Sequence, residues 1–150
     1  MTDLEWISSV LSGAILIVGG WFLAQLVAIP IYKFRVLRTE VIGKLASHKS
    51  VLALYNEPPY GSIKDPEKIT ESQTKWLQDA QVTFRGLASR MRSFSKNEDI
   101  AVWIIRLHGY DPPGASGALF GVSNVLYKYG DERHAQKQAL AKALRLKDEF

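Results

Sequence analysis

The sequence predicts an all-α protein in which one N-terminal transmembrane helix continues into a juxtamembrane helix and is followed by a small helical bundle. Three observations predict this fold class. Residues 6–32 include no charged side chain. Apolar residues after this run recur at spacings of three and four, which is the helical period. No stretch shows the sustained alternation of β-branched and polar residues that is typical of strands.

The uncharged run is long enough to cross a bilayer. As a helix rising about 1.5 Å per residue it would extend roughly 40 Å, more than the roughly 30 Å hydrocarbon core. A secretory signal peptide would begin with basic residues and have a shorter apolar run, whereas this chain begins with Asp3 and Glu5. The core helix of a soluble protein would show one polar face. The polar residues here are only Ser8, Ser9, Ser12 and Gln25.

Flanking charges predict the orientation of the span. Two acids precede it, and the residues that follow are mainly basic: Lys33, Arg35, Arg38, Lys44 and Lys49 against Glu40. Because basic residues stay on the cytoplasmic side, we expect the N-terminus outside and the rest of the chain in the cytoplasm. Lys33, Arg35 and Arg38 are expected to contact anionic lipid. The absence of cysteine fits this location and a disulfide-free periplasmic domain equally.

These features divide the chain into five expected segments. They are a short outer tail over 1–5, a transmembrane helix over 6–32, an amphipathic juxtamembrane helix over 33–56, a loop over 57–66 and a cytoplasmic helical domain over 67–150. Near the inner end of the span, Pro30 predicts a kink or a helix break.

Small residues follow one side of the span. Ser9, Gly13, Gly20, Ala24 and Ala28 fall within about 100° of one another, at about 100° of rotation per residue. Such a face lets two membrane helices approach closely, so we expect self-association or packing against a partner helix here. The alternative is that Gly and Ala are simply frequent in transmembrane helices.

Helical spacing also predicts the first two helices after the span. The juxtamembrane helix should carry one apolar seam that packs on the domain or on a second copy. This seam is Phe34, Leu37, Val41, Leu45, His48, Leu52 and Tyr55. A second helix should begin at Asp65 or Thr70, which are capping residues. Its buried stripe should be Ile69, Trp76, Leu77, Ala80, Phe84, Leu87, Ala88 and Met91.

A third helix is expected over 100–108. Ser95 and Glu98 have the spacing of a capping box before it, and Gly109 should end it. Because this segment is apolar nearly all round, we expect it to be the most buried helix.

Two helices should complete the domain. Asp111 and Pro112 are positioned to open a fourth helix over about 114–129, whose small residues permit close packing. The segment 131–150 is rich in Ala, Lys and Leu. It predicts a polar helix with a weak apolar edge, lying on the surface or fraying.

The sequence offers no recognisable catalytic or metal-binding constellation. His48, His108 and His134 lack the partners of an H-E-x-x-H motif, and no cysteine is present for zinc. There is no G-x-S-x-G elbow, and the segment GASG at 114–117 lacks the strand and the Gly-Lys-Ser/Thr of a phosphate loop. We therefore expect no enzyme activity, no metal, no cofactor and no small-molecule substrate.

A basic cluster is expected at the C-terminal end of the second helix. Arg85, Arg90, Arg92 and Lys96 lie over its last turns. One interpretation is a solvated face with charges that suit a helix C-terminus. The other is a surface for an anionic ligand or an acidic partner. The formal net charge of +4 is modest, so nucleic acid is not the favoured ligand.

Two segments resemble a group of bacterial proteins for which no activity is known. These are FRGLASRMR at 84–92 and GALFGVSNVL at 117–126. In that group the pattern resembles F-R-x-L-A-S followed later by L-I-G-L-S-N, with a short helix and a proline turn between. The resemblance implies one N-terminal span, a basic juxtamembrane helix, a small helical domain and a bacterial source. Together with the predicted span and its orientation, this gives the bacterial inner membrane as the expected location. It implies no catalytic residue.

Two functions follow as expectations. The first is a non-catalytic scaffold or interaction protein that associates with itself or holds a partner at the membrane, with lipid and protein as its partners. The alternative is a membrane-tethered recognition module whose Arg cluster binds a lipid headgroup, an acidic protein or nucleic acid.

Overall fold

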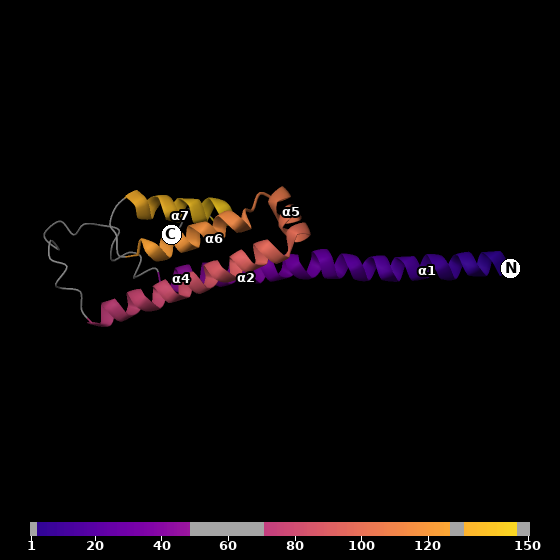
Figure 1. Ribbon diagram of the computed structural model, residues 1–150, viewed down its shortest axis with the longest axis horizontal. Helices are drawn as coiled ribbons and strands as arrows, with labels where there is room; N and C mark the ends of the chain where they lie inside the picture. The colour runs from indigo at the N-terminus through magenta and orange to yellow at the C-terminus, as the bar shows by residue number, and fades with distance from the viewer. Residues whose placement is uncertain (1–2, 49–70, 127–130, 147–150) are drawn as a thin grey trace.

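The computed structural model describes residues 3–48, 71–126 and 131–146. Within these ranges the regular elements are all helical. They are α1 (Asp3–Leu23), the π-helical turn η1 (Ala24–Ala28), α2 (Ile29–Ser47), α4 (Glu71–Asn97), α5 (Asp99–Leu107), α6 (Pro112–Asn124) and α7 (Asp131–Leu144). Figure 1 shows α1 projecting alone from one end of a bundle formed by the other helices. The predicted all-α class is confirmed for this part of the chain.

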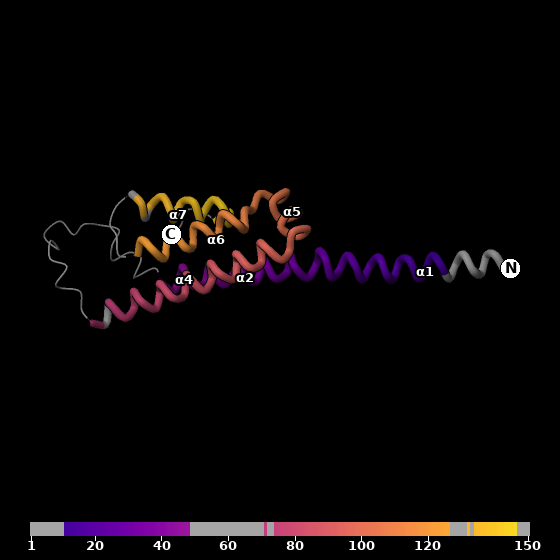
Figure 2. The backbone as a smooth tube through the Cα atoms, in the orientation of Figure 1, coloured from indigo at the N-terminus to yellow at the C-terminus, as the bar shows by residue number. Residues whose placement is uncertain are grey.

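The first three elements form one continuous helix that passes through Pro30 (Figure 2). Proline has no N–H, and its ring clashes with the carbonyl four residues earlier in a regular helix. Here the helix widens into a π turn just before Pro30, and the backbone N–H of Ile29 bonds to the carbonyl of Ala24 instead of Gln25. The proline therefore produces a π turn within an unbroken helix.

The apolar seam predicted on α2 is present. Phe34, Leu37, Val41 and Leu45 are all buried in the core. The helix ends at Ser47, earlier than the end expected at about residue 56, and the remainder of that expected helix lies outside the described residues. At the other end α1 begins at Asp3, so the tail expected over 1–5 is partly helical. The loop expected over 57–66 also lies outside the described residues.

The core of the bundle is built mainly between α4, α6 and α7. The stripe predicted on α4 is buried at Leu77, Ala80, Phe84, Leu87, Ala88 and Met91. Trp76, which was expected to be buried with them, is 56% exposed, because it lies at the edge of the face that packs on α6. The start expected at Asp65 or Thr70 and the stripe residue Ile69 lie outside the described residues. The described part of α4 begins at Glu71.

Small residues of α6 permit the close packing that the sequence predicts. The Ser116 hydroxyl donates a hydrogen bond of 2.9 Å to the carbonyl of Ala88 across the α4–α6 contact. A Cβ atom added at Gly121 would collide with the side chain of Gln136 on α7. The helix opens with Asp111 at its N-cap and Pro112 in its first turn, as predicted, and ends at Asn124 instead of continuing to about residue 129.

Two expectations about α5 are wrong. Its buried residues are Ala101, Val102 and Ile105, but Ile100, Trp103 and Leu107 are 51%, 64% and 67% exposed. It is therefore half exposed and not the most buried helix.

The capping box predicted before α5 is also absent. Glu98 is the N-cap but makes no side-chain capping bond, and the Ser95 hydroxyl donates to the Met91 carbonyl within α4. Gly109 follows α5 with a φ of +81°, the left-handed stop expected of glycine.

Helix α7 is more firmly attached than its polar composition suggested. Leu140, Ala143 and Leu144 are buried in the core, and the backbone N–H of Asp111 donates to the Ala143 carbonyl at 2.8 Å. The weak apolar edge of α7 thus packs on α6. The expectation of a helix that lies on the surface or frays is wrong for the described part of this segment, and residues 147–150 lie outside the description.

Replacing Phe84 with alanine should destabilise the bundle strongly. Phe84 is fully buried, and its ring lies 5.6 Å from that of His48, measured between ring centroids. We expect the free energy of unfolding to fall by about 3–5 kcal/mol, measured by denaturant titration of the detergent-solubilised chain. The matched control is Val82→Ala on the exposed face of α4, which should change stability by no more than about 0.5 kcal/mol. Equal losses for the two variants would contradict the packing described.

Candidate functional site

The projecting part of the long helix is an extended apolar surface. Residues 11–47 include a segment apolar and long enough to cross a membrane, and only 6% of that segment is buried within the protein. Its large side chains are exposed on all sides: Leu11, Ile15, Leu16, Ile17, Val18, Trp21, Phe22, Leu23 and Leu26. A core helix of a soluble protein would instead be covered by its neighbours.

The predicted small-residue face lies on this projecting helix. A Cβ atom added at Gly13 or Gly20 would meet nothing within 4 Å, so the side chains leave open space beside the backbone. Ala24 and Ala28 are exposed and belong to η1. Each residue rotates less in a π turn than in an α-helix because the turn holds more residues, which keeps Ala28 on the same side as Ala24. Ser9 lies in α1, and its side chain is outside the description.

The three basic residues expected to contact lipid have different surroundings. Lys33 forms an ion pair of 2.9 Å with Glu98, the residue before α5. Arg38 donates from Nε to the Leu144 carbonyl at 2.9 Å and from Nη2 to the Arg145 carbonyl at 3.4 Å. Arg35 is exposed. Lipid contact by these residues stays a prediction, and Arg38 has an additional structural role that the sequence did not indicate.

Arg38 belongs to a cluster around Tyr110, which we call the Tyr110 junction. The guanidinium carbons of Arg38 and Arg145 lie 5.5 and 5.9 Å from the centroid of the Tyr110 ring, and Phe34 meets the same ring edge-on at 5.5 Å. Arg145 also donates to the His108 carbonyl at 2.8 Å. Cations over an aromatic face and at helix-terminal carbonyls are both stabilising. The junction therefore ties the end of α7 to α2 and to the α5–α6 turn.

A groove of about 500 Å³ lies beside this junction, between α2 and α5. Its lining combines apolar side chains with cationic ones: Ile31, Phe34, Arg35, Arg38, Thr39, Ile104, Ile105, His108 and Tyr110. The His108 Nδ1 atom is hydrogen-bonded to the Ile104 carbonyl at 2.9 Å. A lining that combines apolar side chains with guanidinium groups suits a ligand that has an acyl chain and an anionic head.

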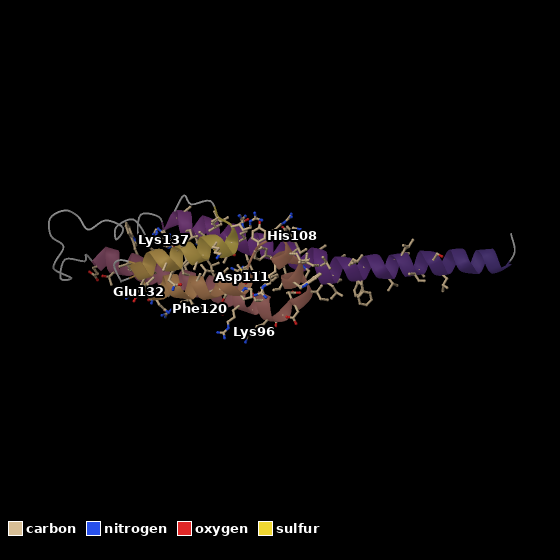
Figure 3. The ribbon with its side chains drawn as sticks, turned by 90° about the horizontal axis from the view of Figure 1, so that it is seen from above. Lys96, His108, Asp111, Phe120, Glu132 and Lys137 are labelled. Atoms are coloured by element: carbon tan, nitrogen blue, oxygen red, sulfur yellow. The ribbon has the colours of Figure 1, made fainter. Side chains whose placement is uncertain are left out.

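The predicted Arg cluster is divided between two faces of α4. Arg90 pairs with Glu40 of α2 at 2.6 Å, whereas Arg85 donates to Asn124 of α6 at 3.0 Å. Arg92 and Lys96 are exposed on the face shared with Arg85. Figure 3 places Lys96 and His108 on opposite edges of the bundle, so the cluster is separate from the groove. Anion binding by these four residues stays a prediction.

The histidines have local packing roles. His48 is hydrogen-bonded through Nδ1 to the Lys44 carbonyl at 2.9 Å, and its Nε2 atom lies 3.6 Å from an Asp79 carboxylate oxygen. His134 is hydrogen-bonded to Gln138 at 2.8 Å. Among the residues described, no group of three or more His, Cys, Asp or Glu side chains could hold a metal ion.

Sequence reasoning missed the exposed apolar face of α5, formed by Ile100, Trp103 and Leu107. A signal was present, because these residues lie opposite Ala101 and Ile105 on a helical projection. The all-round apolar character was interpreted as burial, although a helix can also be apolar on two faces when it has two apolar neighbours.

Comparisons with protein-family models, curated proteins and solved structures found no match to this chain. The resemblance to bacterial single-span proteins therefore stays a hypothesis that rests on the two segments at 84–92 and 117–126.

Replacing Arg38 with alanine should loosen α7. The change removes two charge-assisted hydrogen bonds and one contact with Tyr110, and each hydrogen bond to a charged group is worth about 1.5–3 kcal/mol. We expect faster amide hydrogen exchange along α7 and little change in α4, measured by mass spectrometry of the full chain in detergent. Arg35→Ala is the matched control. Unchanged exchange in α7 of the Arg38 variant would disprove the junction's role.

Proposed function

We propose that this chain is a membrane-anchored, non-catalytic interaction protein. Its projecting helix spans a bilayer, and its bundle stands at one membrane surface. The observation that carries the proposal is the exposure of the long apolar helix, of which only 6% is buried. Leaving so many large apolar side chains in water is unfavourable, by about 25 cal/mol per Å², whereas hydrocarbon solvates them.

The proposed location is the inner membrane of a bacterium, with the N-terminal end outside and the bundle in the cytoplasm. The support is the charge asymmetry across the span. Asp3 and Glu5 precede it, and Lys33, Arg35 and Arg38 follow it. Basic residues close to the end of a span are retained on the cytoplasmic side.

A holding role is proposed because the chain combines an anchor with a well-packed bundle. The same continuous helix supplies both the span and the core residues Phe34, Leu37, Val41 and Leu45. A protein bound to the bundle would therefore be held close to the membrane. Self-association through Gly13 and Gly20 would multiply the number of bundles at one place.

The alternative is a recognition module that binds an anionic ligand through the cluster on α4. It has less support, because Arg90 and Arg85 already have partners in the bundle. Arg92 and Lys96 alone give a weaker field than four converging cations.

The small-residue face predicts the effect of larger side chains in the span. In the Gly13→Ile, Gly20→Ile double variant, the added side chains have open space within one chain, so the monomer should fold normally. They should nevertheless separate two helices that pack through this face. We expect cross-linked dimers in native membranes to decrease at least about tenfold, which corresponds to roughly 1.4 kcal/mol.

Gly19→Ile is the matched control for this prediction. Gly19 also has open space around it but lies on another side of the helix, so its replacement should leave cross-linking unchanged. Equal cross-linking in all variants would reject self-association through this face. The proposed holding role would then require a different protein partner.

A further inference from the structure

Helix α5 is apolar on two opposite faces. Ala101, Val102 and Ile105 are buried against the protein. Ile100, Trp103 and Leu107 are between 51% and 67% exposed. At about 100° per residue these three side chains point away from the bundle on the far side of the helix. Three large apolar residues that share one exposed face indicate a surface that meets an apolar neighbour.

The position of α5 identifies that neighbour. Figures 1 and 2 show α5 lying across the end of the bundle from which α1 projects. It contacts both η1 and α2, and the ion pair between Lys33 and Glu98 joins its start to the end of the uncharged run. Since the buried face of α5 covers the bundle, its exposed face is directed towards the side on which the span lies.

The length of the uncharged run gives the expected depth. Residues 6–32 extend roughly 40 Å as a helix, about 10 Å more than the hydrocarbon core. With residue 6 near the outer interface, the inner hydrocarbon boundary falls close to η1, the turn that α5 touches. The exposed side chains of the span continue through Leu26 and Ile29 to Tyr32 at this level. Because α5 contacts η1, its exposed apolar face lies close to the level at which the apolar surface of the span ends.

Basic side chains line the groove beside α5: Arg35, Arg38 and His108 lie between α2 and α5, and Arg35 is exposed. Lys33 and Arg106 are also exposed, but each already forms an ion pair, with Glu98 and with Asp111 respectively, so the inference depends mainly on Arg35. Basic residues attract the anionic headgroups of the cytoplasmic leaflet. Tryptophan is favoured where a ring can lie partly among acyl chains and partly among headgroups.

We propose that α5 is an in-plane membrane-contacting helix, with Ile100, Trp103 and Leu107 inserted at the boundary between headgroups and acyl chains. This inference rests on the proposed transmembrane anchor and adds a second, separate contact with the bilayer. The two contacts together fix the tilt of the span and the bundle relative to the bilayer, because a single transmembrane helix can adopt a range of tilt angles. The surface that faces the cytoplasm is then always the far end of the bundle.

The absence of native cysteine permits a direct test with nitroxide labels on single cysteines. The full-length variants Trp103→Cys and Leu107→Cys report on α5, Ile17→Cys reports on the span, and Val82→Cys is an exposed apolar control on α4. Each is reconstituted in vesicles of phosphatidylcholine and phosphatidylglycerol. The measured quantity is the collision rate with lipid-soluble oxygen relative to that with a water-soluble nickel chelate. Circular dichroism verifies that each variant is folded.

The expected result is an oxygen-to-nickel ratio at both α5 positions that is shifted from the Val82→Cys value towards the Ile17→Cys value. Ratios at both α5 positions equal to that of Val82→Cys, with Ile17→Cys in lipid, would overturn the α5 proposal and leave the anchor intact. Shielding from both reagents, with spin–spin broadening removed by dilution with unlabelled chain, would assign the face to a second copy and also overturn it. A nickel-accessible Ile17→Cys label would overturn the anchor and the α5 contact together.

Discussion

The fold depends on one long helix whose two halves have different surroundings: the first half is exposed and apolar, and the second half packs in the core of the bundle. From Asp3 to Ser47 the backbone is continuously helical, but the pattern of side chains changes at Pro30. Before it, large apolar residues are exposed around the whole circumference. After it, a single seam is buried, from Phe34 to Leu45. Because the backbone is not interrupted, the orientation of the proposed span is passed directly to the bundle, and no hinge separates the two within the described helix.

The contacts at this change of environment connect distant parts of the chain. Lys33 reaches Glu98 before α5, and Arg38 reaches the carbonyls at the end of α7. Tyr110 lies between Arg38 and Arg145. Charged side chains therefore join α2 to the residue before α5 and to the end of α7. A rigid attachment of this kind is what a protein needs if it is to hold its far end at a constant distance from a bilayer.

The sequence predicts the helical class and the core faces of α2 and α4 because these depend on local spacing. Phe34, Val41, Phe84 and Met91 follow a period that can be read without knowing their neighbours. Gly109 likewise marks its turn by its own conformational freedom, with a φ of +81°.

Other features depend on contacts between distant residues and could not be predicted in this way. The pairing of Arg90 with Glu40, and that of Arg38 with the end of α7, require knowledge of how the helices cross. The exposure of Trp103 depends on where α5 lies relative to the span. The four cations on α4 form a cluster in sequence, but the helical turn divides them between two faces.

The sidedness of the start of α1 and of the bundle relative to the membrane tests the central claim most directly. Asp3→Cys lies at the start of α1, and Ser89→Cys lies on an exposed part of α4. Both would be treated with a membrane-impermeant maleimide in intact bacterial cells and in inverted inner-membrane vesicles. The outer membrane of the cells is first made permeable to the maleimide, and the inner membrane stays intact. The account predicts that Asp3→Cys reacts only in these cells and that Ser89→Cys reacts only in inverted vesicles. Reaction of both variants from the same side would contradict a membrane-spanning helix.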